Sequence, residues 1–357
     1  MSSCLLAGRA SFPPADCVAK PLSYSSAILL FTVPNLRQRV LVTGAAGFIG
    51  SHLTDRLLDL SCEVVGLDNL SSGDRSNLAH ALTNSSFRFV EDDLLDAEAT
   101  GRALEGCDLV FHLAADPEVR AGAGNPDAQF KQNLIGTFNL LEAMRKRASP
   151  TRLVFASTST VYGEASLIPT PEDYGPLLPI STYGATKLGC EALVASYTQL
   201  LPLQTVIFRF ANVVGSRARH GVLYDFITKM RRNPRQLEVM GDGAQAKSYL
   251  HVDDCIDAFR MALDDRLWNS SAQVYNIGSE DQVNVITIAQ IVAKAMGLSN
   301  VSTSTTAKPG GRAWPGDVKT MQLDVSRIKR LGWKPTRNSN EAVRLATNQL
   351  VEELRAG

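Results

Sequence analysis

Short apolar runs alternate with turns and amphipathic stretches from Arg39 onward. Six of these runs are rich in Val, Ile, Leu and Phe, and they read RVLVTG, EVVGLDN, FRFVEDD, DLVFHLAA, RLVFASTS and TVIFRFAN. Segments with helical spacing separate them, for example residues 50–60 and 133–147. This βαβ succession predicts an α/β fold with a doubly wound parallel sheet, covered by helices on both faces. In such sheets a ligand binds beyond the carboxyl ends of the strands.

The regular alternation ends near residue 215. After it, helical pieces mix with short strands such as AQVYNIG. We therefore expect a larger sheet domain over residues 38–215 and a smaller mixed α/β subdomain over 216–357, part of which returns to the sheet. Residues 1–37 are Ser-rich, contain one acid (Asp16) and show no helix or strand period. We expect a disordered extension there, with a transit peptide as the alternative.

Three glycines at three-residue spacing, Gly44, Gly47 and Gly50, follow the first apolar run. A strand that ends at Thr43 and a helix that opens near Gly47 bring backbone N–H groups and a positive helix end together. That arrangement attracts a pyrophosphate. For the glycines alone, a tight turn without a ligand is the alternative.

Asp68 ends the second apolar run, about twenty residues after the glycines. A carboxylate at this place accepts hydrogen bonds from both hydroxyls of an adenosine ribose. No arginine follows it directly in DNLSSG, so a 2′-phosphate would meet a negative charge without a positive partner. The sequence therefore predicts NAD rather than NADP, with Arg75 as the only reservation.

Tyr183 and Lys187 lie four residues apart in STYGATKLGCEAL, at the start of a predicted helix, so both side chains project from one face. A phenol with a pKa of about 10 is a poor base near neutral pH, but a neighbouring ammonium and a nicotinamide cation both favour its phenolate. Upstream, four hydroxyl residues at 157–160 follow the fifth run. One of them, beside Tyr183, can relay a proton or stabilise developing negative charge.

The motifs GAAGFIG, DNLSSG, HLAA, YGATK and RFANVVG, in this order and spacing, resemble the extended short-chain dehydrogenase/reductases, and among them the UDP-glucose (UDP-galactose) 4-epimerases. The resemblance implies a Rossmann fold whose tightly held NAD is reduced and reoxidised within each turnover. It also implies that Tyr183 removes a proton from the sugar 4-hydroxyl, that Lys187 holds the nicotinamide ribose, and that Thr158 is the catalytic hydroxyl residue. Hydride then returns to the opposite face of the 4-keto sugar and inverts C4.

The same resemblance implies two sets of binding residues. Those expected at the cofactor are Gly44, Gly47, Phe48, Ile49, Gly50, Asp68, Asn69, Asp93, Leu94, Ala114, Ala115, Asn133, Tyr183, Lys187 and Phe210. Those expected at the UDP-sugar are Thr158, Asn212, Lys247 and Arg312. Lys247 takes a place usually held by arginine, and Arg312 stands two residues early relative to the usual pattern. Pro117 stands where some epimerases have a lysine that contacts the cofactor.

Three other functions compete with epimerisation. A nucleotide-sugar 4,6-dehydratase resembles the chain, but in that family an Asp-Glu pair follows the active-site threonine, whereas Ser159 and Thr160 follow it here, so elimination is disfavoured. A net sugar or steroid dehydrogenase or reductase would release NADH. A protein that only senses NAD would have no need of the retained catalytic residues. The sugar series stays open, because Met321, near the position that decides whether an N-acetyl group fits, is intermediate in size and flexible.

The composition of the chain limits the classes of partner that we expect it to bind. Thirty-six basic and thirty-six acidic residues cancel, without a long basic block, so neither nucleic acid nor a membrane surface is expected as a partner. The six cysteines lack metal-ligand spacing, so we expect no metal site and reduced thiols. The longest apolar run near the start, residues 27–31, is far shorter than the roughly 20 residues of a membrane span. We expect a cytoplasmic homodimer that pairs through segments 128–147 and 187–200 and takes a UDP-sugar as its substrate.

Overall fold

The computed structural model describes residues 38–120, 124–147 and 151–356. The expectation of a disordered or targeting extension at 1–37 falls outside the described residues. The fold described below is that of the unit Arg37–Gly357.

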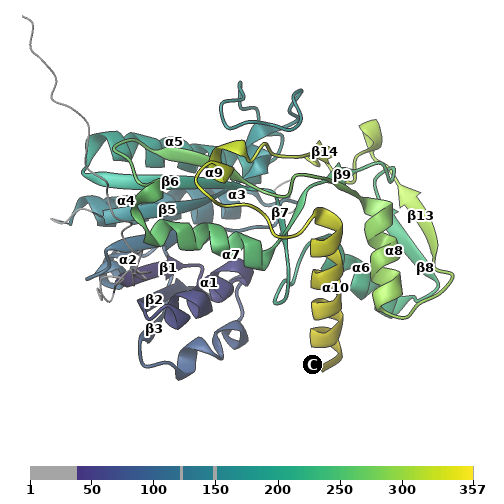
Figure 1. Ribbon diagram of the computed structural model, residues 1–357, viewed down its shortest axis with the longest axis horizontal. Helices are drawn as coiled ribbons and strands as arrows, with labels where there is room; N and C mark the ends of the chain where they lie inside the picture. Colours follow the sequence, from purple (N-terminus) through teal and green to yellow (C-terminus); the bar gives the residue numbers. More distant parts are fainter. Residues whose placement is uncertain (1–37, 121–123, 148–150, 357) are drawn as a thin grey trace, which may run out of the picture. The chain divides into compact units, whose positions relative to one another are not determined.

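A seven-stranded sheet forms the centre of this unit, and every neighbouring pair in it is parallel (Figure 1). In spatial order the strands are β11 (Gln273–Ile277), β6 (Leu203–Phe210), β5 (Thr151–Thr158), β4 (Leu109–His112), β1 (Arg39–Thr43), β2 (Glu63–Asp68) and β3 (Phe87–Glu91). The chain order reverses direction between β1 and β4, which is the switch point where doubly wound sheets bind ligands. The predicted fold class is confirmed.

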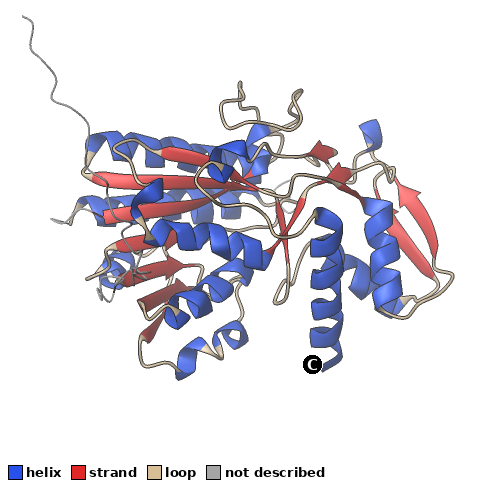
Figure 2. Cartoon of the chain, viewed as in Figure 1, coloured by secondary structure: helices blue, strands red, loops and turns tan. Residues whose placement is uncertain are grey.

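Helices cover both faces of the sheet, which explains why its strands are almost continuously apolar (Figure 2). Val40 and Val42 face one core, with α1 (Phe48–Asp59) and α7 (Val252–Arg260). Leu41 faces the other core, together with side chains of three further helices, α2 (Ala97–Leu104), α4 (Gly136–Arg145) and α5 (Thr182–Leu200). The alternation along β1 therefore places successive side chains in two separate cores.

Two elements of the structure differ in detail from those predicted from the sequence. The helix predicted over 133–147 begins as the short helix α3 (Pro126–Gln129), continues as a π-helical turn, η4 (Phe130–Ile135), and only then becomes α4. The run AQVYNIG, which the sequence places after the regular alternation, forms β11 at the edge of the large sheet beside β6.

Apart from the two cores that flank the large sheet, the C-terminal part of the chain has its own core, called the second core below, which lies beyond the carboxyl ends of the strands. It is built by the helices α6 (Val222–Arg232), α8 (Val285–Ala295) and α10 (Ser339–Ala356) with small sheets. Those sheets pair β7 (Asn212–Val214) with β10 (Tyr249–His251), β8 (Gln236–Met240) with β13 (Ser302–Thr306), and β9 (Ala246–Lys247) with both β12 (Val283–Asn284) and β14 (Thr320–Met321). Among the described residues, the other short helices are η1 (Arg75–Leu78), η2 (Ala81–Thr83), η5 (Ser159–Tyr162), η6 (Met261–Leu263), η7 (Asp265–Leu267), η8 (Pro309–Gly311) and α9 (Ser326–Lys329). None of the helices in the described ranges is long and apolar enough to cross a membrane.

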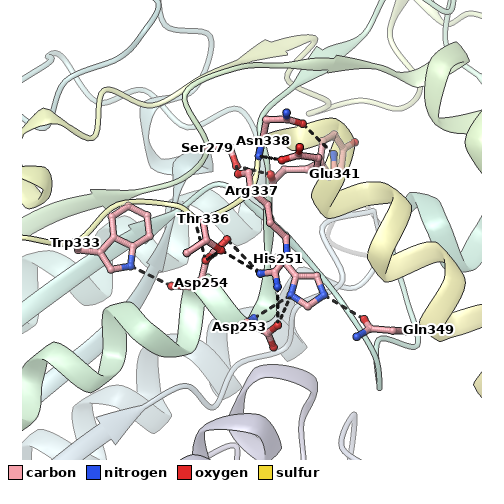
Figure 3. Close-up of polar contacts among 11 residues, drawn as sticks. His251, Asp253, Asp254, Ser279, Trp333, Thr336, Arg337, Asn338, Glu341 and Gln349 are labelled. Carbon is pink, nitrogen blue, oxygen red and sulfur yellow. Dashed lines mark hydrogen bonds and ion pairs between the residues drawn. The ribbon is translucent and has the colours of Figure 1, made fainter.

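Polar contacts at the start of α7 tie the last part of the chain to the sheet (Figure 3). The Asp254 carboxylate accepts hydrogen bonds from the backbone N–H (3.1 Å) and the hydroxyl (2.6 Å) of Thr336, and its backbone carbonyl accepts one from Trp333 Nε1 (3.1 Å). His251 caps α7 by accepting from the backbone N–H of Asp253, and its Nε2 lies 3.1 Å from Gln349 Oε1 on α10. These contacts connect α10 and the segment before it to the start of α7.

Candidate functional site

A cavity of about 520 Å³ opens at the carboxyl ends of the central strands. Its walls come from the turn after β1, the ends of β2, β4, β5 and β6, and the second core around α6, β9 and β14. Its volume is in the range of pockets that hold small molecules and cofactors.

The three glycines after β1 have different structural roles. Gly44 has a φ of +72°, and a Cβ there would lie 2.8 Å from the backbone nitrogen of Ala114. Gly50 brings α1 against the turn, because its Cβ would lie 1.9 Å from the carbonyl oxygen of Gly44. Gly47 is the N-cap of α1 and lines the cavity with Gly44, Phe48 and Ile49, whereas Gly50 supports the turn from behind.

Asp68 lies at the end of β2, beside the glycine turn, and is almost fully buried. One carboxylate oxygen accepts a hydrogen bond from the backbone N–H of Ala46 (2.9 Å), and the other accepts one from Leu70 (2.8 Å). Burial raises the pKa of this carboxyl, and the backbone hydrogen bonds partly oppose that shift. Arg75, the reservation about NADP, instead pairs with Glu91 at 2.8 Å and does not line the cavity.

Asn69 and Leu94 line the cavity, but Asp93 does not. The Asp93 carboxylate accepts hydrogen bonds from the side chains of Asn69 (2.8 Å) and Gln132 (3.2 Å). Burial alone would raise the pKa of Asp93, but hydrogen bonds from the Leu95 backbone, Asn69 and Gln132 outweigh it and lower the pKa. Asp93 therefore holds Asn69 in place from behind the wall.

Ala114, Ala115 and Phe210 lie along the cavity, as does Pro117. Asn133 does not line it and is buried behind it. Its Oδ1 accepts the backbone N–H of Asp116 at 2.7 Å, and its Nδ2 donates to Thr186 Oγ1 at 3.0 Å. Asn133 thus connects the loop after β4 to α5.

Helix α5 brings the predicted catalytic pair to the cavity. Ser181 caps the helix by accepting the backbone N–H of Gly184 (3.1 Å), and Tyr183 and Lys187 line the cavity from the first two turns. Lys187 is 3% exposed, and its Nζ donates to the carbonyl oxygen of Ala156 at 2.9 Å. Burial lowers the pKa of Lys187 to about 8.

The pKa of Tyr183 is raised rather than lowered, first by burial and then by the nearby Cys190 and Asp116. The effect expected from the neighbouring ammonium of Lys187 is therefore smaller than the cost of burying a phenolate.

The hydroxyl residues 157–160, at the end of β5 and the start of η5, lie in the cavity wall. Thr158 caps the short helix η5, because its Oγ1 accepts the backbone N–H of Thr160 at 3.1 Å. Ser157 Oγ donates to Glu191 Oε1 at 2.5 Å. Glu191 in turn forms a buried ion pair with Arg209 of β6, with 2.7 Å between Oε2 and Nη2.

Sequence reasoning missed Glu191 and Arg209. Arg209 stands in the middle of the apolar run TVIFRFAN, and an arginine inside a buried strand needs a counter-charge. Glu191 follows Lys187 by one helical turn on the same face of α5, so the spacing could have identified Glu191 as the counter-charge of Arg209.

The residues predicted for the UDP-sugar are only partly brought together. Asn212 and Lys247 line the cavity, and so does Met321. Lys247 Nζ lies 2.8 Å from Asp317 Oδ1. Arg312 does not line the cavity, because its guanidinium donates to Glu164 Oε2 (2.5 Å) and to the carbonyl oxygen of Asp317 (2.6 Å). In this structure the Arg312 side chain points toward Glu164 rather than into the cavity, and its contact with the UDP-sugar stays a prediction.

Known proteins share this architecture. A family model, the NAD dependent epimerase/dehydratase family, matches residues 40–278. The chain belongs to this family. It is 35% identical over 303 residues to a UDP-glucose 4-epimerase of Mycolicibacterium smegmatis, which covers 83% of this chain and 93% of the relative.

Solved structures agree with this assignment. A crystal structure of a UDP-galactose 4-epimerase has 43% identity and a TM-score of 0.78, covering 89% of this chain and 100% of that one. A UDP-glucuronic acid 4-epimerase from Bacillus cereus, solved with UDP-glucuronic acid and NAD, has 31% identity and a TM-score of 0.80 over the same shares. The predicted family and the NAD cofactor are confirmed, and this chain is a member of a family of nucleotide-sugar epimerases and dehydratases.

Proposed function

We propose that this chain inverts C4 of a UDP-sugar of the glucose/galactose series, using bound NAD. The observation that carries the proposal is the joint placement of Tyr183, Lys187 and Thr158 on one cavity with the glycine turn and Asp68. A base, a cation and a hydroxyl beside a dinucleotide site are the groups that oxidation and reduction of a sugar carbinol need.

The cavity fits NAD on its own geometry. A side chain at Gly44 would collide with the backbone of Ala114, so only glycine lets the turn after β1 pack this closely against the loop after β4. A pyrophosphate would bind at the backbone N–H groups where this turn enters α1. Asp68, at the end of β2, would accept the hydroxyls of the adenosine ribose, and Lys187, on α5, would hold the nicotinamide ribose. When bound, NAD supplies a reversible acceptor for the C4 hydride.

Side chains of the cavity transfer the proton of the sugar 4-hydroxyl and stabilise the charge that develops on its oxygen. Tyr183 takes the proton of the sugar 4-hydroxyl and returns it after the sugar has presented its other face. Because burial raises the pKa of Tyr183, its phenolate needs positive charge nearby, from Lys187 and from the oxidised nicotinamide ring. The Thr158 hydroxyl donates to the oxygen on C4 as negative charge develops there.

Elimination is the nearest alternative, because relatives of this chain include 4,6-dehydratases. That reaction needs an acid to expel the 6-hydroxyl. The two residues that follow Thr158 are Ser159 and Thr160, and neither carries a carboxyl group. This difference supports epimerisation.

A homodimer fits the surface of the sheet domain. Large apolar side chains are exposed on neighbouring helices, with Phe130 (47%) and Ile135 (36%) on η4, Phe138 (41%) on α4 and Leu200 (75%) at the end of α5. A second copy packed against these helices would remove these apolar side chains from water.

The described cysteines, all free and buried, support a reducing compartment such as the cytoplasm.

The test is turnover by purified protein without added NAD. UDP-galactose, UDP-N-acetylglucosamine and UDP-glucuronic acid are incubated separately and followed by proton NMR. We expect galactose-to-glucose conversion, and a loss of at least about 100-fold in Tyr183→Phe, the low end for a lost general base. Tyr224→Phe, outside the cavity lining, is the matched control. Full turnover by Tyr183→Phe would contradict the proposal. Conversion of only one of the other two nucleotide-sugars would assign the enzyme to that sugar instead of the glucose/galactose series.

A further inference from the structure

The indole of Trp314 has an unused hydrogen-bond donor in the cavity wall. Trp314 lines the cavity, and its Nε1 is buried without a partner among the described residues. The other two tryptophans are satisfied, since Trp268 donates to the carbonyl oxygen of Ala262 (3.1 Å) and Trp333 to that of Asp254 (3.1 Å). A buried donor without an acceptor is costly, so a ligand that supplies the acceptor gains that free energy.

Two cationic side chains hold the Trp314 ring. Lys247 Nζ lies 5.7 Å from the ring centroid, and the Arg120 guanidinium carbon lies 6.0 Å from it. They come from different walls, Lys247 from β9 and Arg120 from the loop after β4. Arg120 is itself fixed by Asp225 of α6, with 2.7 Å between Nη1 and Oδ2. The indole is therefore held in position without the ligand.

The free capacity around this ring consists of donors. An indole nitrogen only donates, and an ammonium has three donors, of which Lys247 uses one on Asp317. The carboxylates near this ring already pair with cations or donors: Asp317 accepts from Lys247 (2.8 Å) and from the backbone N–H of Ala313 (3.2 Å), and Asp225 pairs with Arg120 (2.7 Å). A ligand group made only of acceptors, such as a diphosphate, matches this wall.

We propose that Trp314 donates its Nε1 hydrogen to a diphosphate oxygen of the nucleotide-sugar, beside Lys247. This inference rests on the proposed function for the nature of the substrate. It adds an aromatic side chain to the residues that the resemblance implies at the UDP-sugar, among which Arg312 points toward Glu164 in this structure.

Trp314→Phe isolates the contact, because it keeps an aromatic ring between the two cations and removes only the N–H. The probes are UDP and uridine, titrated calorimetrically into the NAD-loaded protein. We expect the Kd for UDP to rise roughly tenfold or more, the loss for a hydrogen bond to a charged acceptor, while the Kd for uridine stays unchanged. Trp268→Phe is the matched control, since it removes an indole N–H away from the cavity and should change neither Kd.

Three outcomes would overturn the proposal. One is an unchanged Kd for UDP in Trp314→Phe. Another is an equal loss for uridine, which would place the contact at the nucleoside. The third is a raised KM for the UDP-sugar with an unchanged Kd for UDP, which would place it at the sugar. Because the probes bind without turnover, a wild-type protein that binds UDP but does not epimerise would contradict the proposed function and leave this test intact.

Discussion

Replacing Glu191 by glutamine should destabilise the protein more than any surface charge change. The Glu191 carboxylate accepts from Ser157 Oγ (2.5 Å) and Arg209 Nη2 (2.7 Å), and both side chains of the ion pair are only 6% exposed. Glutamine keeps the shape but removes the charge, so the Arg209 guanidinium stays buried without a counter-ion. Breaking a buried pair from one side costs about 3–5 kcal/mol of unfolding free energy.

Glu280→Gln is the matched control. Glu280 and Lys329 also form an ion pair at 2.7 Å, but their side chains are 56% and 39% exposed. Surface pairs contribute about 0–1 kcal/mol, so this change should be nearly silent. Urea unfolding at pH 7, followed by circular dichroism and extrapolated to water, measures both losses. Equal losses in the two variants would refute the reasoning that burial decides the energy of the pair.

Glu191→Gln should also reduce the catalytic rate, because Glu191 contacts the end of β5 that carries active-site residues. Ser157, which donates to Glu191, stands between Ala156, whose carbonyl oxygen accepts from Lys187, and Thr158. Losing the Glu191 charge loosens this strand end, so we expect kcat to fall while the KM for the UDP-sugar changes little. An unchanged kcat in a folded Glu191→Gln protein would show that the network supports stability alone.

Three further results are expected. Gly50→Ala should cost about 3 kcal/mol or more in urea unfolding, because its Cβ would lie 1.9 Å from the backbone oxygen of Gly44, whereas Gly101→Ala, with open space, should gain about 0.5–1 kcal/mol. Burial lowers the pKa of His112 to about 3, so as the pH falls below about 6.5 the unfolded chain binds a proton at this residue before the folded protein does. His112 should therefore lower the free energy of unfolding by up to about 1.4 kcal/mol for each unit by which the pH falls in this range. An NMR titration that shows the His112 ring neutral at pH 5 checks this, and a protonated ring contradicts it. Asp68→Ala should weaken NAD binding in calorimetry, and unchanged binding would remove Asp68 from the ribose site.

The sheet could be predicted because its signal is local. Each apolar run of the alternating region carries its own strand pattern, and the glycine turn follows β1 directly in sequence. The position of β11 was harder to predict, since more than sixty residues, including α6 and α7, separate it in sequence from its partner strand β6. Sequence order does not reveal to which edge of a sheet such a strand returns.

The side chains that depended on distant partners were harder to predict. Arg312 was expected at the ligand from its motif, but Glu164, far away in sequence, decides where its guanidinium points. Gly50 is predicted at the cofactor, and the structure adds that it packs against the backbone of Gly44. Glu191 looks like an ordinary helix charge until β6 brings Arg209 against it. In each case a contact between remote segments determines the role.

The central claim is that C4 is inverted by a hydride that leaves and returns within one active site. The most direct measurement is to incubate the purified protein with UDP-galactose in D₂O, without added NAD, and to record the proton NMR spectrum. The account predicts UDP-glucose that still carries protium at C4, with no NADH released into solution. Deuterium at C4, a 6-deoxy-4-keto product or a steady release of NADH would contradict it.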